Sequence, residues 1–257
     1  MVDVGSGQAI VLIPGIQGRW EWMRPAVHAL SAHWRVVTGS LPGEPGEVRC
    51  SADGFDHLVA HIDRMLDEAH LPTAVICGVS FGGLVALRYA ACRGERVRAL
   101  ILVSTPGPRW KPAAHQARYM RWPFLSSPLF VAGAAKRVWR ELRATFPDTR
   151  ARFAFGATWA MEVLAAPGIP SRMGLRARLA ASEQFEHDCS RVQVPTLVIA
   201  GERELDKVVN LDDTLEYVRS IPGAQFSLFE RTGHLGTASA PDRFAAIVSA
   251  FLNQLPD

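Results

Sequence analysis

The sequence predicts an α/β protein with a mostly parallel, doubly wound β-sheet, helices on both faces and one helical insertion. Residues 1–103 and 191–257 alternate short, continuously apolar runs of strand length with segments of helical periodicity. Strands that are apolar along their whole length need cover on both faces, so this alternation is typical of a parallel sheet. Residues 104–190 contain no convincing strand run, which predicts a helical cap inserted into the sheet.

The N-terminal part contains four apolar runs that we interpret as strands. The first, AIVLI, ends at Pro14-Gly15, as expected where a buried strand enters a loop. A segment with apolar residues three and four apart follows the second run, and a stretch of small and apolar residues follows the third. The predicted strands are Ala9–Ile13, Trp34–Thr38, Ala74–Gly78 and Arg98–Val103, and the predicted helices are Phe55–Glu68 and Phe81–Cys92.

The insertion is rich in aromatic residues, and the alternation of strand and helix resumes after it. It holds four of the seven tryptophans, and Lys136–Thr145 and Arg150–Leu164 have helical character. Its aromatic side chains could line an apolar pocket or could pack the cap onto the sheet. The elements predicted after it are strands Thr196–Ala200 and Gln225–Phe229 and helices Leu211–Ile221 and Pro241–Leu255.

The net charge of +3 is small but unevenly distributed. Residues 104–190 hold 13 Lys plus Arg against 6 Asp plus Glu. Such a segment could attract anionic ligands, or it could be a solvated, arginine-rich surface. No nucleic-acid-binding motif accompanies it, so we expect no nucleic-acid partner.

The apolar runs, the N-terminus and the cysteines indicate where in the cell we expect the protein and which cofactors we do not expect. No apolar run is long enough to span a bilayer, and the N-terminus enters a strand without the basic region of a secretory signal. The four cysteines lack metal-ligand spacing, and Cys77 lies in an apolar run, which favours a reduced, cytoplasmic protein. We therefore expect no metal, no cofactor and no membrane association.

The stretch CGVSFGG, residues 77–83, matches the pattern G-x-S-x-G. It lies between an apolar strand and a helix, where a sharp turn needs small neighbours and exposes the serine at the carboxyl end of the sheet. This context predicts that Ser80 is a nucleophile, although by spacing alone it could be an ordinary turn residue. A serine hydroxyl is a weak nucleophile, so it needs a base, an acid that orients the base, and donors for an oxyanion.

Among the eight histidines, His234 is the best candidate for the base. It follows the predicted strand 225–229 in the loop RTGH and precedes the last helix, so it should lie at the same sheet edge as Ser80. The others stand in predicted helices, at helix ends or in loops without a motif: His28, His33, His57, His61, His70, His115 and His187.

The orienting acid should follow the strand 196–200, in the stretch GERELDKVV. Asp206 stands just before two valines, where the chain turns toward the next helix, and Glu204 stands three residues after Gly201. We prefer Asp206, with Glu204 as the main alternative and Glu202 as a lesser one. A buried carboxylate here would fix the imidazole tautomer and stabilise the imidazolium.

Backbone amides are the expected donors to the oxyanion. One should belong to Phe81, the residue after the nucleophile. The other should come from the loop PGIQG that follows the first strand, with Ile16 preferred and Gln17 second. The glycines of this loop would also suit a simple tight turn.

With these motifs in this order, the chain resembles the α/β-hydrolase superfamily in its compact form with a helical cap. The similarity extends over the whole length: IPGIQG for the oxyanion loop, SLPGEPG for the next loop, GVSFGG for the nucleophile turn, then DKVV and GH. It implies the family order of nucleophile, acid and base for Ser80, Asp206 and His234. It also implies that the cap, residues 104–190, follows the sixth strand of the family fold.

Two departures from the family pattern bear on the site. Pro14-Gly15 stands where many members have His-Gly, which changes the hydrogen bonding of the loop but leaves the backbone donor in place. The acid loop is one or two residues longer than usual after Gly201, which keeps Glu204 as a rival of Asp206.

The resemblance and the serine together narrow the range of reactions that we expect. Dehalogenases and epoxide hydrolases of this fold use an aspartate at the turn, so Ser80 argues against both. We expect a carboxylesterase-like serine hydrolase that cleaves small or medium hydrophobic esters through an acyl-enzyme. A C–C bond hydrolase, a thioesterase or a perhydrolase would use the same triad, and a non-catalytic small-molecule-binding member of the fold is the alternative from another class.

Overall fold

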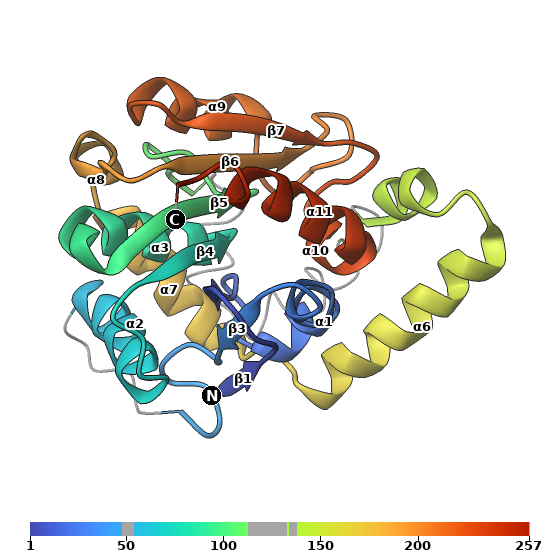
Figure 1. Ribbon diagram of the computed structural model, residues 1–257. Helices are drawn as coiled ribbons and strands as arrows, with labels where there is room; N and C mark the ends of the chain where they lie inside the picture. Colours follow the sequence, from blue (N-terminus) through green and yellow to red (C-terminus); the bar gives the residue numbers. More distant parts are fainter. Residues whose placement is uncertain (48–53, 113–132, 134–137, 257) are drawn as a thin grey trace.

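The computed structural model describes residues 1–47, 54–112, 133 and 138–256. Its centre is one seven-stranded sheet with the strand order β1-β3-β2-β4-β5-β6-β7 (Figure 1). Strand β1 is antiparallel to β3, and the other neighbouring strands are parallel, which confirms the predicted mostly parallel α/β sheet. The strands are β1 Val2–Val4, β2 Ala9–Ile13, β3 Arg35–Thr38, β4 Ala74–Val79, β5 Val97–Val103, β6 Thr196–Gly201 and β7 Gln225–Phe229.

Six of these strands fall on the six predicted strands, and β1 is the exception. Its three residues are largely exposed and pair only with β3 at one side of the sheet. A short, solvent-facing edge strand buries little apolar surface, so it leaves no apolar run in the sequence.

Side chains of the central strands alternate between two hydrophobic cores, because successive residues of a strand point to opposite faces. On β5, Leu100 and Leu102 belong to the core under α2, α3, α8 and α9, whereas Ile101 and Val103 belong to the core under α1 and α11. The helices outside the insertion are α1 Arg24–Ser31, α2 Asp56–Glu68, α3 Phe81–Cys92, α9 Leu211–Ser220, α10 Gly236–Ser239 and α11 Pro241–Leu252, with 3-10 turns η1 Trp20–Met23 and η2 Gly94–Arg96.

The described part of residues 104–190 is helical from 138 onward. Residues 138–145 form a helix, and α6 Thr149–Ala165, α7 Pro170–Ser182 and α8 Phe185–Arg191 follow it. Residues 136 and 137 of the predicted helix lie outside the described residues. Helix α8 packs Phe185 and Cys189 into the core that it shares with α3. The division into a core and a cap of residues 104–190 stays a prediction.

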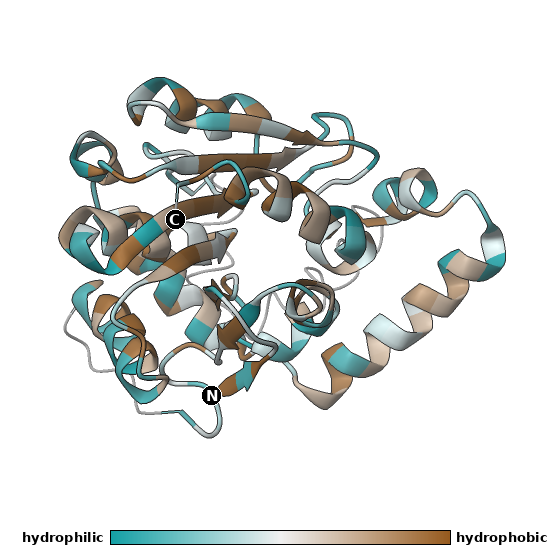
Figure 2. Ribbon diagram, in the orientation of Figure 1, coloured by the Kyte–Doolittle hydropathy of each residue, from teal (hydrophilic) through white to brown (hydrophobic). Residues whose placement is uncertain are grey.

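Helix α6 stands apart from the sheet and buries none of its residues (Figure 1). Much of its ribbon is apolar (Figure 2), and three of its apolar side chains are 65%, 71% and 79% exposed: Phe153, Met161 and Leu164. An aromatic row links this helix to the core. The ring of Phe155 lies 5.0 Å from that of Phe146 and 6.5 Å from that of Trp159, which meets Trp22 of η1 edge to face at 5.8 Å.

Candidate active site

Strand β4 ends in a sharp turn at Ser80, which precedes helix α3. Ser80 has φ 55° and ψ −121°, a conformation that costs an L residue of order 1–3 kcal/mol. Glycines make the turn possible, because a β-carbon at Gly78 would lie 2.2 Å from the Gly82 carbonyl oxygen. A β-carbon at Gly83 would lie 1.9 Å from Thr105 Oγ1. A strained serine at the carboxyl end of a central strand is the geometry of a nucleophile turn.

Side chains from two other loops meet Ser80. His234 Nε2 lies 3.1 Å from Ser80 Oγ, and His234 Nδ1 lies 3.2 Å from Asp206 Oδ2. Asp206 follows β6 and His234 follows β7, and both strands run parallel to β4, so the three loops converge at one edge of the sheet. The structure therefore brings together the three residues that the sequence singles out as nucleophile, acid and base.

Asp206 is a buried carboxylate held by two backbone amides. Its Oδ1 accepts hydrogen bonds from the amides of Val208 and Val209, each at 2.9 Å. Burial by itself would raise the pKa of this carboxyl, but the charge and hydrogen bond of His234 and the two amides hold it below its ordinary value. An ionised Asp206 favours the imidazole tautomer that carries its hydrogen on Nδ1.

The loop that carries His234 lies close against the acid loop. A β-carbon at Gly233 would lie 2.6 Å from the Leu205 carbonyl oxygen, so a glycine is needed immediately before the histidine. Burial opposes a positive charge on His234, but the Asp206 carboxylate, and to a lesser extent Glu141, raise its pKa above the ordinary value. The environment thus favours the imidazolium that forms when a base accepts a proton.

The two other candidate acids lie elsewhere. The side chain of Glu204 is 71% exposed and faces Arg140 and Lys207, each at 3.8 Å. Glu202 accepts the backbone amide of Arg231 at 2.6 Å, at the start of the loop that leads to His234. Of the three acids in GERELD, the structure places Asp206 against the histidine.

The loop after β2 turns beside Ser80. A hydrogen bond of 2.9 Å closes a tight turn over residues 15–18, whose two central amides are those of Ile16 and Gln17. A β-carbon on the first glycine of this turn would lie 3.5 Å from Ser80 Cβ. The amide of Phe81, at the first position of α3, has no carbonyl partner within its own helix. The predicted oxyanion donors thus border the serine on two sides.

A buried ion pair, which the sequence analysis missed, supports the same turn. Arg176 on α7 donates to Glu44 Oε1 at 2.7 Å and to the Ile16 carbonyl oxygen at 3.0 Å. The two side chains are 4% and 0% exposed. Gly18 makes room for the guanidinium, because a β-carbon there would lie 2.3 Å from Nη1. The signal in the sequence is slight: one acid within the loop SLPGEPG.

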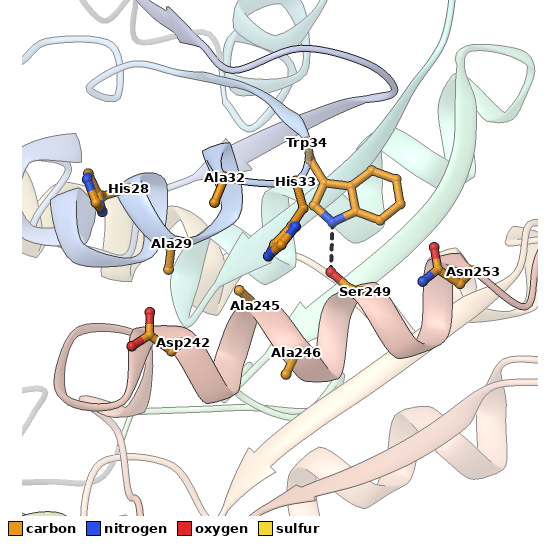
Figure 3. Close-up of a pocket in the computed structure, with 10 residues that line it drawn as sticks. All are labelled: His28, Ala29, Ala32, His33, Trp34, Asp242, Ala245, Ala246, Ser249 and Asn253. Atoms are coloured by element: carbon orange, nitrogen blue, oxygen red, sulfur yellow. Dashed lines mark hydrogen bonds between the residues drawn. The ribbon is translucent and has the colours of Figure 1, made fainter.

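A separate groove of about 610 Å³ lies between α1 and α11 (Figure 3). In its wall, Trp34 Nε1 donates to Ser249 Oγ at 2.8 Å. The lining residues are His28, Ala29, Ala32, His33, Trp34, Asp242, Ala245, Ala246, Ser249 and Asn253. None of the predicted catalytic residues is among them, so this groove is not the site of the chemistry at Ser80.

The described residues contain neither a candidate metal site nor a candidate membrane-spanning helix. They contain no group of three or more His, Cys, Asp or Glu side chains placed to hold a metal ion. Within the same residues, no helix combines the length and the apolar character needed to cross a membrane.

Three known proteins show what this chain is similar to. It is 24% identical over 259 residues to a pimeloyl-(acyl-carrier protein) methyl ester esterase from Nitrosomonas europaea, with 96% of each chain covered. It is 26% identical to a 2-hydroxy-6-oxo-2,4-heptadienoate hydrolase from Pseudomonas putida, over 97% of this chain and 91% of that one. The solved structure of the enol-lactonase from Burkholderia xenovorans has a TM-score of 0.78 at 21% identity, over 98% and 95% of the two chains.

A protein-family model matches most of the chain. Residues 8–241 match the family described as alpha/beta hydrolase fold. This span runs from the first parallel strand to the start of the last helix, and it includes the three loops that meet at Ser80. The chain therefore belongs to the α/β-hydrolase fold family, and the two relatives aligned above are hydrolases.

Proposed function

We propose that this protein is a serine hydrolase that cleaves carboxylic esters through an acyl-enzyme on Ser80. The observation that carries the proposal is the pair of contacts made by His234, 3.1 Å to Ser80 Oγ and 3.2 Å to Asp206 Oδ2. A strained serine and a buried carboxylate each cost folding free energy, and a purely structural role would require neither.

The first half of the reaction transfers the acyl group to the protein. His234 Nε2 accepts the hydroxyl proton while Ser80 Oγ attacks the ester carbonyl carbon. The amides of Ile16 and Phe81 stabilise the oxyanion, and each such donor contributes about 10²–10³-fold in rate. The imidazolium then gives its proton to the departing alkoxide, the C–O bond breaks, and the alcohol leaves.

The second half releases the acid. His234 accepts a proton from a water molecule whose oxygen attacks the acyl carbon, and a second tetrahedral oxyanion forms at the same amides. As it collapses, the bond to Ser80 Oγ breaks, and the imidazolium returns its proton to the serine. Asp206 keeps its negative charge throughout and stabilises the imidazolium in both halves.

Apolar side chains of the insertion support a hydrophobic ester as substrate. The aromatic row of α6 reaches Trp22, which lies just beyond the turn that carries Ile16. Helix 138–145 contacts the loop of His234 through Glu141. The insertion thus contacts the chain just beyond the Ile16 turn through aromatic rings of α6, and the loop of His234 through helix 138–145. We therefore propose small or medium hydrophobic esters.

Hydrolysis of a C–C bond in a diketone-type compound is the second candidate. The relative from Pseudomonas putida, which is named for a 2-hydroxy-6-oxo dienoate, favours it. The same serine, histidine and aspartate would serve both reactions, so the substrate rather than the triad separates them.

Steady-state kinetics on p-nitrophenyl esters from acetate to octanoate tests the proposal. We expect Ser80→Ala to lower kcat by at least about 10³-fold, because the residual rate comes from binding and the oxyanion amides alone. Ser182→Ala, which changes an exposed serine at the end of α7, should match the wild type. Undiminished turnover by Ser80→Ala would refute the proposal, and faster cleavage of a 2-hydroxy-6-oxo dienoate than of every ester would favour the second candidate.

A further inference from the structure

Glu141 is a buried carboxylate on the insertion that contacts the loop of the histidine. It is 2% exposed, whereas the other residues of helix 138–145 are half-buried or exposed. Its two oxygens accept the backbone amide of Leu235 at 2.9 and 3.1 Å. The amide of Gly233 also lies close enough to this carboxylate to favour its charged form. One side chain of the insertion is therefore bonded to the residue after His234 and acts on the residue before it.

Packing alone does not account for an acid in this position. Burial raises the pKa of Glu141 to about 7, against the effects of the two amides and of His234, which favour the charged form. An apolar side chain of similar size would fill the same space without this desolvation cost. The carboxylate is suited to holding a backbone donor next to an imidazole.

Other hydrogen bonds join the same helix to the start of the loop. Thr145 Oγ1 donates to the Arg231 carbonyl oxygen at 2.8 Å. The Arg231 guanidinium donates in turn to the Ala144 carbonyl oxygen at 2.8 and 3.0 Å. Helix 138–145 is thus bonded to the loop at residue 231 and again at residue 235.

We propose that Glu141 is a positioning residue, which holds the histidine loop by its Leu235 amide and so couples the docking of helix 138–145 to the alignment of His234 with Ser80. The proposal rests on the function proposed above for these two residues. Glu141 does not touch the reacting atoms. It acts through the backbone of the base and through its negative charge, which favours the imidazolium.

The charged groups around Glu141 fix the sign of its electrostatic effect. His234 and Asp206 are the titratable groups that interact with it, and the Arg231 guanidinium binds the same helix. Arg140, the preceding residue, faces Glu204 instead. Removal of the Glu141 charge leaves Asp206 as the anion beside the imidazole, so the pKa of His234 should fall.

The test compares Glu141→Gln with Glu162→Gln, which removes a partly buried acid of α6 that pairs with Arg24. We expect Glu141→Gln to lower kcat on p-nitrophenyl acetate by about 10–100-fold with little change in KM, as loss of alignment does. The acid limb of the pH profile of kcat/KM should move to lower pH, because the imidazole loses one favourable anion. Glu162→Gln should change neither.

An NMR titration of the His234 imidazole, in a Ser80→Ala background, measures the coupling without any turnover. It should show a lower pKa in Glu141→Gln and an unchanged pKa in Glu162→Gln. Glu141→Asp, which keeps the charge but shortens the side chain, should lower kcat while the pKa stays near that of the wild type. This variant keeps the proposal testable if Glu141→Gln fails to fold.

A His234 pKa that is the same in Glu141→Gln, Glu162→Gln and wild type would overturn the proposal, even if activity fell. So would wild-type kcat in both Glu141 variants. If no ester is hydrolysed by the wild type, the proposed function fails, and the titration still decides whether Glu141 is coupled to His234.

Discussion

Close backbone contacts and a hydrogen bond to the neighbouring strand hold Ser80 in its strained conformation. The Gly82 backbone passes so close to the first loop that a β-carbon there would lie 2.4 Å from the Ile13 carbonyl oxygen. The amide of Ser80 donates to the Val103 carbonyl oxygen at 2.8 Å, which ties the turn to the neighbouring strand. The surrounding structure thus determines where the serine hydroxyl points, and strain of this kind is typical of functional sites.

Asp206→Asn should lose far more activity than Glu204→Gln. An amide at residue 206 would favour the wrong imidazole tautomer, for which we expect about a 10³–10⁴-fold fall in kcat/KM on a p-nitrophenyl ester. Glu204 is exposed and faces only Arg140 and Lys207, so its substitution should change kcat/KM by less than about 2-fold. The opposite ranking of the two variants would reassign the acid.

The candidate triad could be predicted because each member follows a strand that the sequence marks, continuously apolar for β4 and β6 and alternating for β7. The sequence could not predict that Glu204 is exposed and Asp206 is buried, because both residues stand in the same short loop and differ only in their tertiary contacts. Glu141 and Arg176 were missed for a related reason. Their main partners lie 94 and 132 residues away in the sequence, and no local pattern marks such pairs.

Helix α7 acts on the oxyanion loop through its buried guanidinium. Arg176 donates to the carbonyl oxygens of Ile16 and Pro42 and to Glu44, so it joins two loops to one helix. Arg172 lies one turn earlier on the same helix, and it contacts the same carboxylate at 3.4 Å with a side chain that is 36% exposed. The two arginines share a partner but differ in burial.

Arg176→Ala should therefore destabilise the protein much more than Arg172→Ala. Arg176→Ala removes the buried partner of the Glu44 carboxylate. This loss should lower the free energy of unfolding by about 3–5 kcal/mol, which corresponds to about 10 °C in Tm. Arg172→Ala removes a partly solvated contact and should lower Tm by about 2 °C or less. Thermal unfolding followed by circular dichroism measures both. Equal Tm values for the two variants would show that the buried pair contributes little to folding.

The helices and strands that are easiest to predict are those buried along their whole length or along one face. The run AIVLI is buried at every position in β2, and the period of apolar residues in α2 matches its buried face. Helix α8 gave a weaker signal, because only three of the seven residues in its motif-free stretch FEHDCSR are buried, and one of them is an aspartate. Its membership of the core depends on contacts with elements distant in sequence.

At the scale of the whole molecule, the insertion holds both loops that flank Ser80. Glu141 binds the loop of the base, and Arg176 binds the loop of an oxyanion donor. The uneven charge of the sequence fits this arrangement, since basic residues of the stretch 104–190 pair with acids outside it. Three such pairs are Arg176 with Glu44, Arg140 with Glu204 and Arg109 with Glu216.

Arg140 and Arg109, whose side chains are 59% and 65% exposed, fit the interpretation of a solvated, arginine-rich surface, whereas Arg176 is buried against Glu44. These pairs also give the insertion a part in the geometry of the site, since the alignment of three loops at one sheet edge depends on side chains from outside the sheet. By the proposed function, this alignment makes Ser80 a nucleophile.

Mass spectrometry of the protein after reaction with a fluorophosphonate tests that claim most directly. We predict one covalent adduct that maps to Ser80 in the wild type, none in Ser80→Ala, and labelling slowed by at least about 10³-fold in His234→Ala, because the hydroxyl then lacks its base. An adduct that persists in Ser80→Ala, or labelling of Ser80 that proceeds equally fast without His234, would contradict the account.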